Sequence, residues 1–328
     1  MSGWGYEDVV ARYSEEFYPA YRRLAHAMAA LLRRRLDEHG HHLVEISHRA
    51  KDVDSFGKKA IRKGYADPLS EIGDKAGVRV VLPFARDRPE IERIFDEFLI
   101  LAGRDDKRLT LGVDRVGYLG LHFQAEIPAG ELAENEQDLV GLQAELQLHT
   151  KAENAWSTAT HDTLYKAPLP VPDEIARRIN RLAVLAEVFD SEVGIFQDEL
   201  LALPDFALLE TLVPPLEREL LRFTGRKPDL GLSRMILPAV AELTRLPADR
   251  IHPELVAPYL AKHGAELKAL YDDYESDDRA NPLLFQPEAL LIFERLASDR
   301  YRLRQAWPPS VPESALFALA RTRGVVYD

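Results

Sequence analysis

The segment GLQAELQLHTKAENAWSTATHDTLYK, residues 141–166, decides the fold because two periodicities meet inside it. Apolar and polar residues alternate from Leu142 to His149, which predicts a strand with one buried and one polar face. After that strand the alternation stops and a helix is expected. Glu145 and Gln147 then share one strand face, and Asn154 lies on the helix behind it. The segment therefore predicts a strand that runs directly into a helix.

The residues before this segment carry both helical and strand signals. Apolar side chains recur at spacings of three and four over residues 6–38, which predicts an amphipathic helix. The β-branched run from Gly77 to Pro83 predicts a buried strand. Further strands are expected at residues 43–48, 109–116 and 119–127, and further helices at 89–101 and 174–201. These signals predict an α+β fold, a mixed β-sheet flanked by helices.

The character of the chain changes after Pro204. Helical segments separated by proline, glycine and aspartate clusters follow, without a strand signal of comparable strength. We therefore expect two domains, a sheet-containing domain over residues 1–203 and an all-helical C-terminal extension over residues 204–328, whose role the sequence does not indicate.

Composition excludes several classes of function. The chain has 328 residues, no cysteine and a formal net charge of −12, so thiolate nucleophiles and cysteine-based zinc sites are ruled out. Residues 1–66 carry 12 Lys/Arg against 9 Asp/Glu, a net charge of +3, so the rest of the chain has a net charge of −15. This acidic remainder argues against broad, nonspecific binding of polyanions. Without a recognisable signal peptide or a spanning apolar stretch, we expect a cytoplasmic protein with no membrane partner.

Two carboxylates and a basic cluster are the candidates for chemistry. Asp74 lies just before the strand that begins at Gly77, and Glu145 lies on a later strand that is a possible neighbour. Two converging carboxylates together with substrate phosphates suit Mg²⁺. The basic residues of segment 49–63 suit a triphosphate. On spacing alone, however, the carboxylates are ordinary, and a solvated helix face is the better interpretation of the basic cluster unless other motifs support phosphate binding.

Taken together, these motifs resemble the RelA/SpoT nucleotide pyrophosphokinases, from about residue 44 to residue 166. The strand-to-helix segment is similar to the family's Glu-x-Gln-x-x-Thr strand and Trp-x4-His-x3-Tyr-Lys helix. Upstream, the chain matches the family's Arg-x-Lys-x3-Ser-x3-Lys and Asp-x-x-Gly-x-Arg elements and, in altered form, its Gly-Tyr-x-Ser-x-His element. The matching residues of these three elements are Arg49, Lys51, Ser55 and Lys59; Asp74, Gly77 and Arg79; and Gly117, Tyr118 and His122.

The resemblance implies a nucleotidyltransferase-like synthetase fold and a reaction. The β,γ-pyrophosphate of ATP would be transferred to the 3′-hydroxyl of GTP or GDP, with release of AMP. Asp74 and Glu145 would be catalytic and would bind Mg²⁺. The resemblance assigns ATP to Arg49, Lys51, Ser55, Lys59 and Arg79, and the acceptor nucleotide to Tyr118, His122, Gln147 and Asn154.

The acceptor side departs from the family pattern at three positions. Leu119, Gly120 and His149 stand where a basic residue, a serine and an arginine are usual. The acceptor therefore stays open. A toxin-type relative that makes (p)ppApp or pyrophosphorylates the 3′ end of tRNA, with an antitoxin partner, is one alternative. A catalytically silent nucleotide sensor is another, and a homo-oligomer is compatible with each hypothesis.

Overall fold

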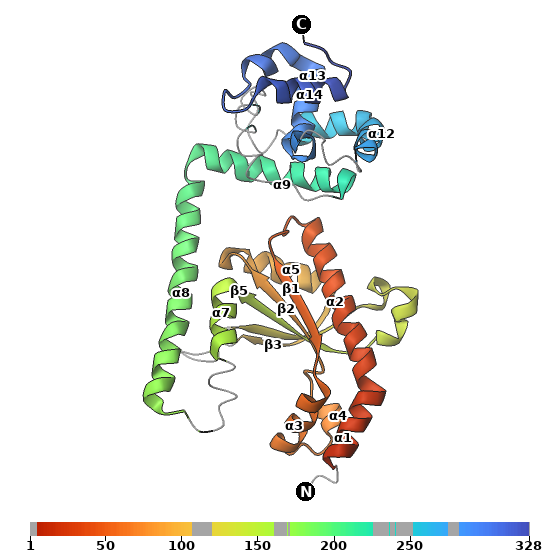
Figure 1. Cartoon of the computed structure of the whole chain (residues 1–328), viewed down its shortest axis with the longest axis vertical. Helices are drawn as coiled ribbons and strands as arrows, with labels where there is room; N and C mark the ends of the chain where they lie inside the picture. The colour runs from red at the N-terminus through yellow and green to blue at the C-terminus, as the bar shows by residue number, and fades with distance from the viewer. Residues whose placement is uncertain are drawn as a thin grey trace. The chain divides into compact units, whose positions relative to one another are not determined.

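The computed structural model describes residues 5–106, 120–160, 169, 171–225, 236, 240, 252–274 and 282–327. The chain divides into two compact units, residues 1–196 and 197–328. The first contains the sheet and the second is helical (Figure 1). The expected fold class, a mixed sheet with flanking helices and a helical C-terminal region, is therefore confirmed.

The first unit is built on a five-stranded sheet with the order β1-β2-β5-β4-β3. β2 and β5 run parallel, and the other neighbouring pairs are antiparallel. The expectation that the strand carrying Glu145 neighbours the strand after Asp74 is thus confirmed, because these are β5 and β2. The strands are β1 (Glu45–Ala50), β2 (Ala76–Leu82), β3 (Ile100–Asp106), β4 (Leu121–Glu126) and β5 (Ala144–Thr150).

The two faces of the sheet differ in character. On one face, buried apolar residues of β2, β4 and β5 pack against α2 and α5 to form the main core. The opposite face is polar, and α7, which follows β5 directly, lies beside it (Figure 1). The helices of this unit are α1 (Tyr6–Arg12), α2 (Tyr18–Glu38), α3 (Val53–Lys63), α4 (Pro68–Glu71), α5 (Arg88–Phe98), α7 (Lys151–Thr160) and α8 (Asp173–Leu201).

Several boundaries differ from those expected. The helix expected over residues 6–38 is interrupted by a π-helical turn at Tyr13–Phe17, where the buried Tyr13 ring stacks on Phe56 at 3.8 Å. The helix expected to reach Leu101 ends at Phe98, and Ile100 begins β3 because the chain pairs there with β4. The first strand runs over Glu45–Ala50 instead of 43–48, and the strand expected at 109–116 lies outside the described residues.

The second unit has its own apolar core, formed by buried leucines, isoleucines and aromatic rings. Its described residues contain helices and no strand. Among all described residues, no helix combines the length and the apolar character needed to cross a membrane. The helices of this unit are α9 (Pro204–Thr224), a π-helical turn (His252–Val256), α12 (Ala257–Asp273), a 3₁₀ turn (Pro282–Phe285), α13 (Glu288–Gln305) and α14 (Glu313–Thr322).

Candidate functional site

Strand register brings four polar side chains onto one face of the sheet. Gly77 of β2 pairs with Glu145 of β5, and Arg79 pairs with Gln147. On the other side of β2, Arg49 of β1 pairs with Gly77. Side chains two residues apart on a strand share a face. Arg49, Arg79, Glu145 and Gln147 therefore surround a position without a side chain, Gly77.

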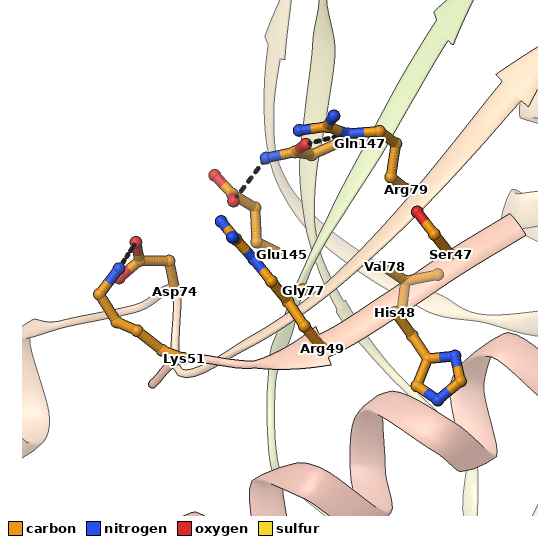
Figure 2. Close-up of a pocket in the computed structure, with 10 residues that line it drawn as sticks. All are labelled: Ser47, His48, Arg49, Lys51, Asp74, Gly77, Val78, Arg79, Glu145 and Gln147. Carbon is orange, nitrogen blue, oxygen red and sulfur yellow. Dashed lines mark hydrogen bonds and ion pairs between the residues drawn. The ribbon is translucent and has the colours of Figure 1, made fainter. Parts of the chain in front are cut away.

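A cavity of about 280 Å³ lies over this face. Arg49, Asp74 and Glu145 project into it, whereas His48 points away from them (Figure 2). A Cβ built on Gly77 meets only the backbone oxygen of Glu145, at 3.9 Å. The fold could therefore accommodate a side chain here, and the glycine leaves that space open to the cavity. The cavity is lined by Ser47, His48, Arg49, Lys51, Asp74, Gly77, Val78, Arg79, Glu145 and Gln147.

Asp74 is held between two lysines at one end of the cavity. Lys51 Nζ donates to one carboxylate oxygen over 2.8 Å and Lys59 Nζ to the other over 2.9 Å. Burial alone would raise the pKa of Asp74, but the hydrogen bonds and charges of the two lysines outweigh burial and lower it. The carboxylate is therefore ionised at neutral pH, beside two cations suited to phosphate oxygens.

Glu145 is hydrogen-bonded from two directions. Gln147 Nε2 donates to Oε2 over 2.8 Å, and His122 Nδ1 lies 3.2 Å from Oε1. Burial raises the pKa of Glu145, and the contacts with His122 and Gln147 more than offset this, so the pKa lies below its ordinary value. A partly buried, ionised carboxylate in an open cavity is suited to accept a proton or to contact a metal ion.

Arg79 connects the sheet to the helix behind it. Its Nε donates to Gln147 Oε1 over 3.0 Å, and its Nη1 donates to Asn154 Oδ1 of α7 over 3.1 Å. Gln147 in turn donates to Glu145. A chain of hydrogen bonds therefore fixes the side chains on the polar face before any ligand arrives.

One described residue that was assigned from the sequence lies apart from this constellation. Ser55, in the first turn of α3, donates its backbone N–H to Asp52 over 2.9 Å and is not among the cavity-lining residues. Tyr118 lies outside the described residues. His122 lies in the site, where its described contact is with Glu145. Ser47 and His48 of β1 also line the cavity. The sequence analysis did not single them out, because the register in which β1 pairs with β2 cannot be read from the local sequence.

A buried polar network supports the junction of β5 and α7. Thr150 N–H donates to the Glu153 carboxylate over 2.8 Å, and Glu153 N–H donates to the Thr150 hydroxyl over 3.1 Å, a reciprocal capping arrangement. Arg88 Nη2 donates to the same carboxylate over 2.7 Å. The Thr150 hydroxyl donates to Asp190 of α8 over 2.6 Å. This network fixes the strand that carries Glu145 against both helices.

The donor set fits a divalent metal that arrives with phosphates. Asp74 and Glu145 are both ionised, and Mg²⁺ is commonly held by one or two carboxylates together with substrate phosphates and water. Among the described residues there is no group of three His, Asp or Glu side chains able to hold a metal by themselves. Asp74 and Glu145 are the residues that would hold such an ion.

Fold and site together define an α+β protein with a cleft over the sheet in which carboxylates, a lysine and arginines converge. Comparison with known proteins identifies the region that carries the site. Residues 48–169 match the model described as the region found in RelA/SpoT proteins. The resemblance noted in the sequence is confirmed for this region of the chain.

Individual relatives match about half of the chain. GTP pyrophosphokinase YwaC from Bacillus subtilis strain 168 is 28% identical over 47% of this chain and 74% of its own length. GTP pyrophosphokinase YjbM from the same strain is 28% identical over 56% of this chain and 89% of its own length. The solved structure of small alarmone synthetase 1 from Bacillus subtilis bound to its product pppGpp is 25% identical, with a TM-score of 0.48, over 58% of this chain and 98% of that one.

Proposed function

We propose that this protein is a Mg²⁺-dependent nucleotide 3′-pyrophosphokinase that transfers the β,γ-pyrophosphate of ATP to GTP or GDP. The activity of the two GTP pyrophosphokinase relatives supports the reaction class. The observation that carries the proposal is the convergence of Lys51, Asp74 and Glu145 on one cavity, with Lys59 donating a second hydrogen bond to Asp74.

The donor nucleotide is assigned to the basic end of the cavity. Lys51 and Lys59 bind the phosphates once the nucleotide competes with Asp74 for them, because phosphate oxygens accept the same charge-assisted hydrogen bonds. Arg49 lies beside Gly77 on β1, and Arg79 lies two residues further along β2; their planar guanidinium groups suit the faces of a purine. Mg²⁺ held by Asp74 and Glu145 would neutralise charge on the transferred phosphates.

The acceptor is assigned to the Glu145 end. Glu145 accepts the proton of the 3′-hydroxyl, and Gln147 keeps the carboxylate oriented toward the cavity. Phosphate transfer needs little covalent help from the protein, so positioning and charge neutralisation account for most of the rate. His122, Asn154 and Tyr118 complete the proposed acceptor side.

The test is incubation of the purified chain with Mg²⁺ and ATP labelled at the γ-phosphate, with GDP, GTP, ADP or bulk tRNA as acceptor. We expect label in a guanosine tetra- or pentaphosphate and stoichiometric AMP. Label in an adenine product or in tRNA alone would move the acceptor to that class. No product with any acceptor, together with measurable ATP binding, would contradict the enzyme and favour a nucleotide sensor.

A further inference from the structure

The hydroxyl of Tyr13 joins two segments that end at the lysine side of the cavity. It donates to the carbonyl of Lys51 over 2.9 Å and lies 3.4 Å from the carbonyl oxygen of Lys75. The N–H of Lys51 donates to that same Lys75 carbonyl over 2.8 Å. Tyr13 therefore links the residue after β1 to the residue after Asp74, and Lys51 Nζ in turn contacts Asp74 (Figure 2).

The ring of the same tyrosine contacts the helix that carries the second lysine. It stacks on Phe56 of α3, with ring centroids 3.8 Å apart and an interplanar angle of 3°. Phe56 precedes Lys59 by three residues, so the two are neighbours on the surface of α3. Tyr13 thus holds both elements that place a cation on Asp74, because its hydroxyl binds the backbone of Lys51 and its ring packs on α3.

The close approach of α1 to α3 depends on a glycine. A Cβ built on Gly57 of α3 would lie 2.5 Å from Cγ2 of Val10 and 2.8 Å from Cε2 of Tyr6, both on α1. After α1 the chain continues as a π-helical turn that begins at Tyr13, and such turns are rare and often lie at functional sites. The glycine and the wide turn together let the tyrosine side chain make its two contacts.

Apolar packing alone does not account for the hydroxyl group of Tyr13. The residue is fully buried in a small cluster with Val9, Phe56 and Ile72. A buried hydroxyl costs free energy unless it is hydrogen-bonded, and a phenylalanine would fill the same space without that cost. Burial also raises the pKa of Tyr13, so the hydroxyl stays protonated and remains a donor. The contribution of this oxygen is therefore the connection between the two backbone segments.

We propose that Tyr13 is a positioning residue for the donor nucleotide, because it fixes Lys51 and Lys59 relative to each other. Both cations are then in place when the triphosphate competes with Asp74 for them. This inference rests on the proposed transfer from ATP. Since positioning accounts for much of the rate of phosphate transfer, disorder here would weaken use of the donor and spare the acceptor, which is assigned to the Glu145 end.

The first experiment removes only the hydroxyl. Tyr13→Phe keeps the ring, and the matched control is Tyr21→Phe, at a mostly buried tyrosine of α2 whose ring lies 5.4 Å from Lys75 Nζ. Calorimetry with Mg²⁺ and a non-hydrolysable ATP analogue should give a dissociation constant about three- to tenfold higher for Tyr13→Phe, the effect of one lost hydrogen bond, and no change for the control. The KM for ATP should rise while the KM for the acceptor stays constant. Equal affinity of Tyr13→Phe and the native chain, or equal losses in both variants, would overturn the proposal.

The second experiment does not depend on the transfer reaction. Hydrogen exchange should be faster at the Lys51 amide in Tyr13→Phe, because the carbonyl of the same residue loses its donor, while the amides of β5 keep their native rates. A native chain that binds no ATP analogue would refute the proposed function and the donor role with it. Unchanged exchange at Lys51, with nucleotide binding by the native chain intact, would refute the role of Tyr13 alone.

The third experiment displaces the tyrosine without changing it. Gly57→Ala places a methyl group against α1, so it should weaken binding of the ATP analogue. Adding Tyr13→Phe should then weaken binding little further, because both changes act through the same contact. Fully additive losses would show that the two residues act independently and would contradict the proposal. Circular dichroism melting of each variant verifies that the compared chains are folded.

Discussion

The Nδ1 atom of His122 lies 3.2 Å from Oε1 of Glu145, across the antiparallel pair of β4 and β5. This contact is one of the two that lower the pKa of Glu145 against the effect of burial. Replacing His122 with Phe should therefore raise that pKa and move the acid limb of the activity profile to higher pH. The profile of kcat against pH measures this, with His26→Phe, an exposed histidine of α2, as control. An unchanged acid limb would show that His122 does not affect the ionisation of Glu145.

Removing the charge of Glu145 should abolish transfer while sparing the donor site. We expect Glu145→Gln to lower kcat by about 10²- to 10⁴-fold, the range for loss of a general base. The dissociation constant of a non-hydrolysable ATP analogue, measured by calorimetry, should change little. Glu126→Gln is the matched control, because Glu126 lies on the neighbouring strand and contacts Gln143. Full activity of Glu145→Gln would assign the base elsewhere.

Gly77 should matter for ligand space and not for folding. Its backbone is ordinary extended strand, and a Cβ there meets nothing closer than 3.9 Å, so Gly77→Val is compatible with β2. The valine side chain would occupy the space between Arg49 and Glu145. We expect a thermal midpoint at least equal to that of the native chain and a large loss of nucleotide affinity. Gly130→Val, in open space outside the cavity, is the control. Retained affinity would mean that the ligand does not approach the sheet at Gly77.

His149 should make stability depend on pH. Burial, reinforced by the charges of Arg79, His122 and Arg88, lowers its pKa from 6.5 to about 3. Between these values the unfolded chain binds a proton that the folded chain does not, so this contribution to the free energy of unfolding is complete above pH 6.5 and decreases as pH falls toward 3. Urea unfolding of His149→Gln between pH 4.5 and 7 should show a shallower pH dependence than the native chain. An identical slope would refute the assignment.

Magnesium should bind only together with a nucleotide. Both oxygens of Asp74 are occupied by Lys51 and Lys59, and the described residues provide no three-ligand cluster. We expect titration calorimetry to detect no Mg²⁺ binding to the free protein at millimolar concentration and clear binding when an ATP analogue is present. Asp74→Asn should weaken the nucleotide-dependent binding. Tight binding of Mg²⁺ to the free protein would contradict shared coordination.

Local pattern predicted the elements that form the floor of the site. The alternation over residues 142–149 fits β5, and it correctly places Glu145 and Gln147 on the polar face because side chains of a strand alternate strictly. The β-branched run after Asp74 likewise fits β2, although the strand begins at Ala76. Several motifs that follow one another in the order found in the family were sufficient to predict the fold class.

The pairing of strands and the packing of distant residues determined features that local sequence patterns did not predict. The apolar run after Phe98 is compatible with helix or strand, and only its register with β4 makes it β3. The contact between His122 and Glu145 depends on which strands are neighbours and in what register. Similarly, the π-helical turn at Tyr13 accompanies the stacking of that ring on Phe56, 43 residues away in sequence.

Thr150 joins three elements through a single hydroxyl group. It ends β5, accepts the backbone N–H of Glu153 in α7, and gives its only hydroxyl proton to Asp190 in α8. Since this hydrogen bond joins β5 to α8, α8 cannot shift relative to the end of β5 without breaking it. A displacement of α8 would therefore act on the strand end five residues from Glu145, so the position of this helix and the placement of that carboxylate share one mechanical linkage.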